Sequence, residues 1–163
     1  MKLQLNNFKH KLQNSDQLIL TVAKWKEQGL KIVFTNGCFD LLHPGHVDYL
    51  VKASALGNKL VLALNTDASV QKLKGLSRPI QSQEARAFIL SAFSFIDALT
   101  FFDEDTPLAL IQMLQPDILV KGADYNINSV VGADDVIKNG GSVVLLPYLE
   151  NYSTSAIEKK IKG

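Results

Sequence analysis

Two of the three histidines in this 163-residue chain, His43 and His46, lie three positions apart in the stretch TNGCFDLLHPGH. Gly37 and Gly45 accompany them, and glycines allow a ligand to approach the backbone closely. Imidazoles at positions i and i+3 lie on the same side of a helix's first turn. Free N–H groups and the helix dipole favour anions there. The stretch therefore predicts a phosphate-binding site with two side-chain donors.

The histidine pair could instead have one of two different roles. The histidines could bind a metal ion, although two histidines alone are an incomplete ligand set. They could also be structural, with His43 in the N-cap position and His46 packed beneath the helix. Spacing alone does not decide between these possibilities, because short motifs also arise by chance.

An alternating pattern of strands and helices surrounds the pair. Short apolar runs predict buried strands over 31–36, 58–67, 97–103, 117–122 and 142–148. Helical spacing predicts helices over 46–57, 82–95, 105–116, 128–141 and 153–163, and a short helix followed by a loop over 68–81. In 105–116 we expect Asp105 or Thr106 as the N-cap, with Pro107 near the first helical position. This alternation predicts an α/β fold, Rossmann-like, with three α/β/α layers and a mostly parallel sheet.

The length suits a single domain. We expect residues 1–30 to form a leader with one helix over 15–28, and residues 31–163 to form the main domain. The apolar side of the leader, which includes Leu18 and Trp25, could cover the core or form a dimer contact.

The composition excludes several classes of protein. Apolar residues make up 47% of the chain, charged residues 20%, and the formal net charge is +1. This balance argues against general nucleic-acid binding and against disorder. The single cysteine, Cys38, cannot form an internal disulfide. The polar N-terminus has no apolar signal-peptide core, and no apolar run approaches the length of a membrane span. We therefore expect a cytoplasmic protein with no nucleic-acid or membrane partner.

Basic side chains follow the second predicted strand. Parallel α/β sheets bind ligands at the carboxyl ends of their strands. Lys72, Lys74 and Arg78 lie beyond such an end and could close over a polyphosphate. A solvated basic loop is the alternative.

Two further strand ends carry polar residues. Asp124, after the fourth predicted strand, could bind a sugar hydroxyl or could simply stabilise a turn. Ser153, Thr154 and Ser155 begin the last predicted helix and offer either a second anion site or an ordinary N-cap.

Several of these segments resemble a known family. TNGCFDLLHPGH resembles the HxGH signature of the cytidylyltransferase-like nucleotidyltransferase superfamily, and STSAI resembles its ISTT-type signature, with Ser155 in place of a threonine. The LKG..RP and LVKGADY segments resemble the adenylyltransferase domain of ADP-heptose synthesis, although Ala123 stands where that family often has glycine. The resemblance covers about 31–161. In many bacteria this domain is joined to a kinase, and here we expect it to be free-standing.

The resemblance implies a nucleotidyltransferase fold and a specific reaction. AMP would pass from ATP to D-glycero-D-manno-heptose 1-phosphate, giving ADP-heptose and pyrophosphate for lipopolysaccharide core or another heptose-containing glycan. It also implies Mg²⁺, bound mainly through the phosphates, and a homodimer.

Roles for individual residues follow from the same resemblance. His43 and His46 would contact the α- and β-phosphates, and Lys74 would stabilise the transition state, with Lys72 in reserve. The residues expected to bind the nucleotide are Thr35, Asn36, Gly37, Phe39, Gly45, Lys121, Gly122, Asp124, Tyr125, Ser153, Thr154 and Ser155. Those expected on the sugar-phosphate side are Asp40, Asn65, Lys72, Arg78 and Arg86. Asp40 could instead help to hold Mg²⁺ or cap its loop.

Two rival functions share part of this pattern. A CTP-dependent cytidylyltransferase acting on glycerol 3-phosphate would share the first motif, but such enzymes usually carry a tryptophan where this chain has Tyr125. A non-catalytic nucleotide-binding protein is the other rival. Against it, every phosphate-handling position expected from the family is filled.

Overall fold

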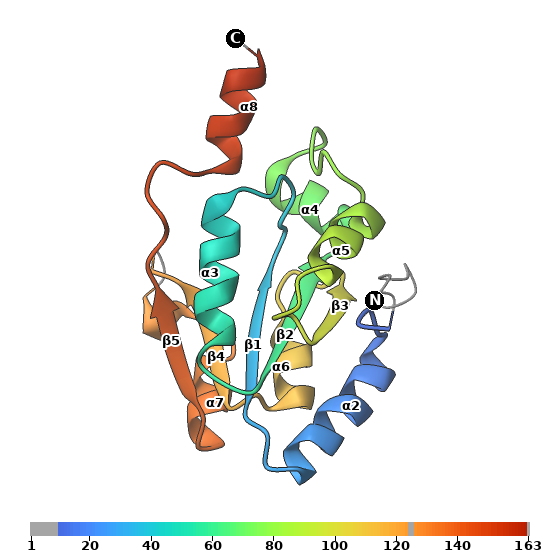
Figure 1. The fold of residues 1–163 in the computed structure, drawn as a ribbon, viewed down its shortest axis with the longest axis vertical. Coiled ribbons are helices and arrows are strands. Elements are labelled where there is room, and N and C mark those ends of the chain that lie inside the picture. The colour runs from blue at the N-terminus through green and yellow to red at the C-terminus, as the bar shows by residue number, and fades with distance from the viewer. Residues whose placement is uncertain (1–9, 124–125, 163) are drawn as a thin grey trace.

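The computed structural model describes residues 10–123 and 126–162, without the side chains of Asn128 and Lys162. Its centre is a five-stranded, all-parallel sheet (Figure 1). The strands, in the spatial order β3-β2-β1-β4-β5, are β1 Ile32–Gly37, β2 Lys59–Asn65, β3 Ala98–Phe102, β4 Ile118–Gly122 and β5 Ser142–Leu146. The Rossmann-like α/β fold predicted from the sequence is confirmed.

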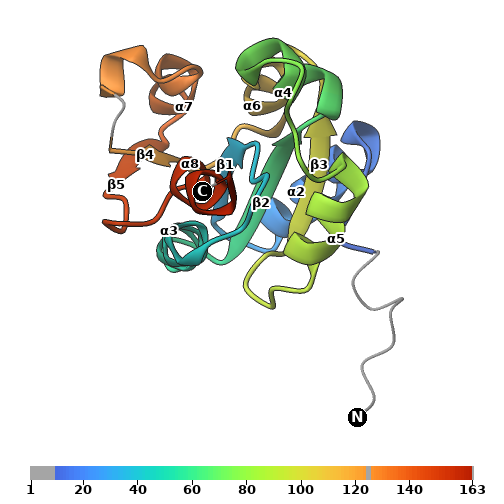
Figure 2. The same cartoon turned by 90° about the horizontal axis from the view of Figure 1, so that it is seen from above.

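Helices cover both faces of this sheet. They are α2 Ser15–Glu27, α3 Pro44–Ser54, α4 Asp67–Lys74, α5 Gln83–Ser91, α6 Leu108–Leu114, α7 Ala133–Lys138 and α8 Thr154–Lys162, with the 3₁₀ turn η1 Ile127–Ser129. Figure 2 shows α3 and α5 on one face and α2, α6 and α7 on the other, while α8 stands above the carboxyl edge of the strands. In the described part of the chain, no helix combines the length and the apolar character needed to cross a bilayer.

The core is divided between the two faces of the sheet because strand side chains alternate in direction. Ile32 and Phe34 of β1 belong to a cluster that includes residues of α2, α6 and α7. Val33 points to the other face and belongs with Leu50 of α3 and Leu90 of α5. Burial on both faces explains why strands β1 to β4 appear in the sequence as continuous apolar runs rather than alternating ones.

Helix α2 is stabilised by a capping box at its start and by burial of its apolar side. The Asn14 side chain accepts a hydrogen bond from the Gln17 backbone N–H, and the Gln17 side chain accepts one from the Asn14 backbone N–H, which forms a capping box. Leu18 and Val22 are buried in the core on the α2 face. Just before the helix, Leu12 forms a parallel bridge to Leu99 of β3.

Two element predictions are wrong in detail. The N-cap of α6 is Pro107, with no side-chain hydrogen bond, rather than Asp105 or Thr106. The helix predicted over 128–141 is divided into η1 and the shorter α7, because Gly132 between them adopts a φ of 81°. Such a φ lies in the left-handed region and interrupts a right-handed helix.

Candidate functional site at the carboxyl edge of the sheet

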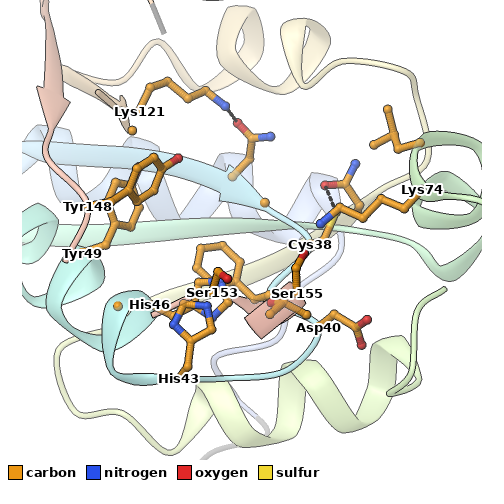
Figure 3. Close-up of a pocket in the computed structure, with 18 of the residues that line it drawn as sticks. Cys38, Asp40, His43, His46, Tyr49, Lys74, Lys121, Tyr148, Ser153 and Ser155 are labelled. Carbon is orange, nitrogen blue, oxygen red and sulfur yellow. Dashed lines mark hydrogen bonds between the residues drawn. The ribbon is translucent and has the colours of Figure 1, made fainter. Parts of the chain in front are cut away.

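A cavity of about 770 Å³ opens where the strands end (Figure 3). It brings together most of the side chains that the sequence pattern singles out. The predicted site residues that line it are Asn36, Gly37, Phe39, Asp40, His43, Gly45, His46, Asn65, Lys74, Lys121, Gly122, Ser153, Thr154 and Ser155. They come from β1 and the loop after it, α3, β2, α4, β4 and α8, so the cavity exists only in the folded chain.

The two histidines form a stacked pair. Their ring centroids are 3.8 Å apart with an interplanar angle of 21°, and the His46 ring also contacts Phe39 at 5.0 Å. His43 occupies the N-cap position of α3, but its side chain makes no capping bond. The Nδ1 atoms of both rings are buried without a hydrogen-bond partner in the described part of the chain. Both histidines nevertheless line the cavity, so the pair can meet a ligand there.

Glycine at position 45 leaves room for this arrangement. A Cβ there would lie 3.1 Å from Cε1 and Nδ1 of His43 and 3.3 Å from the Cβ of Tyr152. The second distance shows that the segment leading into α8 passes directly over the histidine loop. The first turns of α3 and α8 therefore face the same cavity.

Both imidazoles are held in the neutral form. Burial lowers the pKa of His43. Burial also lowers the pKa of His46, to about 4, with help from the repulsion that a protonated His43 and Lys74 would exert on its charged form, and against a smaller opposing effect of the Leu41 backbone. An arriving anion would reverse this balance, because a nearby negative charge favours the imidazolium.

The loop after β1 turns sharply to place Phe39 beneath the histidines. Phe39 has a φ of 47°, which is uncommon for a residue with a side chain. Gly37 allows the turn, since a Cβ there would be 2.8 Å from Cε2 of the Phe39 ring. The local backbone is thus shaped around an aromatic support for His46.

The far end of the cavity is formed by β4 and the chain after β5. Lys121 is nearly buried and hydrogen-bonds the side chain of Asn36. The Tyr148 hydroxyl lies so close to Gly122 that an added Cβ would be 2.0 Å from it. Gly122 is therefore required for the tyrosine to occupy this position.

Lys74 reaches the cavity from the last turn of α4. Thr66 caps the start of this helix by accepting a hydrogen bond from the Ser69 N–H at 3.1 Å. Gly75 ends it with a φ of 92°. Lys72, on the same helix, is exposed and does not line the cavity.

Arg86 lies behind the cavity rather than in it. Its side chain is fully buried and donates to the carbonyl oxygens of Cys38 at 2.6 Å and Asn65 at 2.8 Å. It also donates to the carbonyl of Gln81 and pairs with Asp67 at 2.7 Å. The guanidinium thus joins the histidine loop, the end of β2 and the start of α4, and presents no group to a ligand in the cavity.

Thr35 and Arg78 also lie outside the cavity lining. The Thr35 hydroxyl is buried and bonds the Tyr49 hydroxyl at 2.8 Å and the Val120 carbonyl at 3.1 Å. Arg78 forms ion pairs with Asp40 and with Glu158 of α8. Both residues therefore support the site from its periphery. Asp124 and Tyr125 are outside the described residues.

The carboxylate of Asp40 is fully engaged by its own surroundings. It accepts hydrogen bonds from the backbone N–H groups of Ile80 at 2.8 Å and Gln81 at 3.0 Å, besides its pairing with Arg78 at 2.8 Å. Burial would raise the pKa of Asp40, but these hydrogen bonds outweigh it and lower the pKa. These bonds join the histidine loop to the segment after α4.

Several lining residues carry no functional prediction from the sequence. They are Cys38, Tyr49, Leu73, Phe102, Asp105, Thr106, Pro107, Val131, Tyr148, Leu149 and Tyr152. Phe102 and Tyr148 lie at or just after strand ends, so the rule that ligands bind at carboxyl ends could have identified them. Val131 carries no comparable signal in the sequence.

No group of three or more histidine, cysteine, aspartate or glutamate side chains gathers into a metal-binding arrangement within residues 10–123 and 126–162. With Asp40 engaged, the described residues offer no cage for a divalent cation.

A family model described as cytidylyltransferase-like matches residues 34–160. The match includes most of β1, the other four strands and the residues that line the cavity, and the chain belongs to this family of nucleotidyltransferase fold.

Individual relatives of the chain narrow the comparison further than the family model does. The chain is 52% identical over 151 residues to the bifunctional protein HldE of Azorhizobium caulinodans, which covers 93% of this chain and 32% of that protein. It is 54% identical over 156 residues to HldE of Campylobacter jejuni subsp. doylei, covering 96% of this chain and 32% of the relative. The chain thus spans about a third of the length of these relatives.

Two solved structures share the fold. A lipopolysaccharide core biosynthesis protein from Thermoplasma volcanium superimposes with a TM-score of 0.60 at 26% identity, covering 77% of this chain and all of that one. A pantoate-beta-alanine ligase from Francisella tularensis superimposes with a TM-score of 0.58, covering 93% and 76% of the two chains. At 16% identity, the second likeness concerns the fold alone.

Proposed function

We propose that this chain transfers AMP from ATP to D-glycero-D-manno-heptose 1-phosphate, forming ADP-heptose and pyrophosphate. Support comes from the similarity to HldE proteins at about half of all positions. The observation that carries the proposal is the neutral, stacked histidine pair, which lines the same cavity as the first turn of α8. The use of cellular ATP and a sugar phosphate agrees with a cytoplasmic location.

The chemistry needs alignment more than proton transfer. The attacking oxygen of a sugar phosphate is already ionised at neutral pH, so no general base is required. The protein must hold this oxygen in line with the α-phosphorus and stabilise charge on the transferring and leaving groups. His43 and His46 would donate to the α- and β-phosphates, and each gains positive character as negative charge develops.

Other residues that line the cavity would bind the remaining phosphates, the nucleoside and the acceptor. Ser153 accepts a hydrogen bond from the Ala156 N–H at 3.1 Å and so caps α8, and all three residues of this helix start, Ser153, Thr154 and Ser155, line the cavity. This turn would bind the β- and γ-phosphates. Lys74 would approach the transition state from α4. Gly122 and Lys121 would lie along the nucleoside, and Asn65 would face the acceptor.

Mg²⁺ would arrive with the nucleotide. Magnesium commonly keeps several waters and is bound through substrate phosphates rather than by an all-protein cage, which suits the absence of a ligand cluster in the described chain. When bound, it would supply charge neutralisation on the leaving pyrophosphate.

The test is pyrophosphate release in the presence of Mg²⁺, crossing ATP and CTP with heptose 1-phosphate in both anomeric forms and with glycerol 3-phosphate. We expect release only with ATP and one heptose 1-phosphate anomer. Release with CTP and glycerol 3-phosphate would instead assign the chain to the cytidylyl branch. Binding of ATP without release in any combination would favour a non-catalytic nucleotide-binding protein.

A further inference from the structure

The histidine loop and helix α8 are joined by a chain of charged side chains that the proposed chemistry does not use. Arg78 donates through one terminal nitrogen to Asp40 at 2.8 Å and through the other to Glu158 of α8. Asp40 lies three residues before His43, and Glu158 lies one helical turn after Thr154. We call this Asp40–Arg78–Glu158 arrangement the bridge. Each of its ends lies within one helical turn or loop of a residue that lines the cavity, His43 at one end and Thr154 at the other.

We propose that Arg78 is a positioning residue that holds the first turn of α8 over the histidine pair, with Glu158 as its partner on the helix. The proposal rests on the proposed function, because it concerns the binding of the β- and γ-phosphates by that turn. Residues four apart lie on one face of a helix, so fixing Glu158 also fixes the direction in which Thr154 points.

Helix α8 needs such an attachment. None of the α8 side chains that the structure describes is fully buried, and Ile161 near its end is 75% exposed. In Figure 1 the helix projects from the body of the molecule beyond the carboxyl edge. Apolar packing therefore contributes little to its placement, and polar contacts must contribute more.

The two halves of the bridge differ in strength. The Asp40 side chain is 1% exposed and that of Arg78 11%, and the same carboxylate is also fixed by two backbone N–H groups. The Glu158 side chain is 27% exposed. Because water screens ion pairs at exposed positions, the Glu158 end is the weaker one. Arg78 remains with the histidine loop, while α8 is the part that can be released.

The proposal predicts different effects on the binding of ATP and of AMP, because the two ligands differ in their phosphates. ATP reaches the first turn of α8, whereas AMP lacks the β- and γ-phosphates that this turn would bind. Glu158→Gln should therefore weaken ATP binding by about fivefold, the factor that corresponds to ~1 kcal/mol for a partly exposed ion pair, and leave AMP binding unchanged. Arg78→Lys should do the same, because an ammonium group cannot span both carboxylates as the guanidinium fork does.

The experiment is calorimetric titration of the full chain with ATP and with AMP, in the wild type, Glu158→Gln, Arg78→Lys and the double variant. Glu150→Gln, in the segment before α8, is the matched control, because it removes the same charge at an exposed position that does not line the cavity. We expect the double variant to lose no more ATP affinity than either single one, since both remove the same contact.

Three results would overturn the proposal: an unchanged ATP affinity in Glu158→Gln, an equal loss of affinity for ATP and AMP in that variant, or additive losses in the double variant. Failure of the proposed function has a different signature. The wild type would then bind ATP more tightly than AMP, with the dependence on Glu158 intact, yet release no pyrophosphate with any acceptor.

Discussion

His46 lines the cavity, and its pKa lies well below the ordinary value for histidine. Its ring is stacked on His43, supported by Phe39 and kept neutral by burial. We expect His46→Ala to lower turnover by about two orders of magnitude or more, the scale of losing one oxyanion donor at ~3 kcal/mol. Steady-state pyrophosphate release measures the change. His10→Ala, at an exposed position outside the cavity, is the control, and near-normal activity of His46→Ala would contradict the phosphate assignment.

The same residue should respond to ligand in a titration. In the free protein, the His46 pKa of about 4 lies below the ordinary value near 6.5. Protonation between these values favours the unfolded chain, so the folded state loses stability as the pH falls from about 6.5 towards 4. Bound triphosphate should raise the pKa. NMR titration of the imidazole signals, with and without a non-hydrolysable ATP analogue, tests this, and a pKa insensitive to the analogue would contradict it.

Residue identity could be predicted from the sequence more readily than side-chain direction. The histidine pair, Lys74 and the serines at the start of α8 all reach the cavity, as their strand-end or helix-start positions indicate. Arg86 follows the same helical spacing as its neighbours, yet its side chain turns inward to the carbonyls of Cys38 and Asn65. Those acceptors lie 48 and 21 residues away in the chain, so no local pattern reveals them.

At the level of elements, strands were easier to predict than helix ends. Strands β1 to β4 are mostly buried on both faces and therefore leave continuous apolar runs. Helix α6 begins after Pro107 rather than with the expected Asp105 or Thr106 cap, which line the cavity instead. Residues that favour N-cap positions also favour binding sites, and composition alone does not separate the two roles.

Helix α4 should deliver Lys74 to the transition state. We expect Lys74→Ala to lower kcat more than it raises the KM for ATP, since the ammonium group would act on charge that develops during transfer. Initial-rate kinetics over a range of ATP concentrations measure both constants. Lys138→Ala, at the exposed end of α7, should change neither. A change in KM alone would make Lys74 a ground-state binding residue.

For the molecule as a whole, the leader contributes to the fold. Leu18 is fully buried in the core on the α2 face, so Leu18→Ala should reduce the free energy of unfolding by about 2–5 kcal/mol. Leu20→Ala, on the same helix but 65% exposed, should have an effect within about 0.5 kcal/mol. Urea denaturation of both variants measures the difference. Equal stabilities would show that residues 1–30 can be separated from the domain at little cost.

The β-bridge between Leu12 and Leu99 covers part of an outer strand of the sheet. Strand β3 ends the sheet on one side, and an uncovered outer strand is a template for pairing with other molecules. Here the Leu99 N–H donates to the Lys11 carbonyl at 2.8 Å, and the Gln13 N–H donates to the Leu99 carbonyl at 2.9 Å. The short segment before α2 thus occupies hydrogen-bonding positions that a second copy of the chain could otherwise take. At Leu99, this edge of the sheet is therefore closed to pairing with another strand.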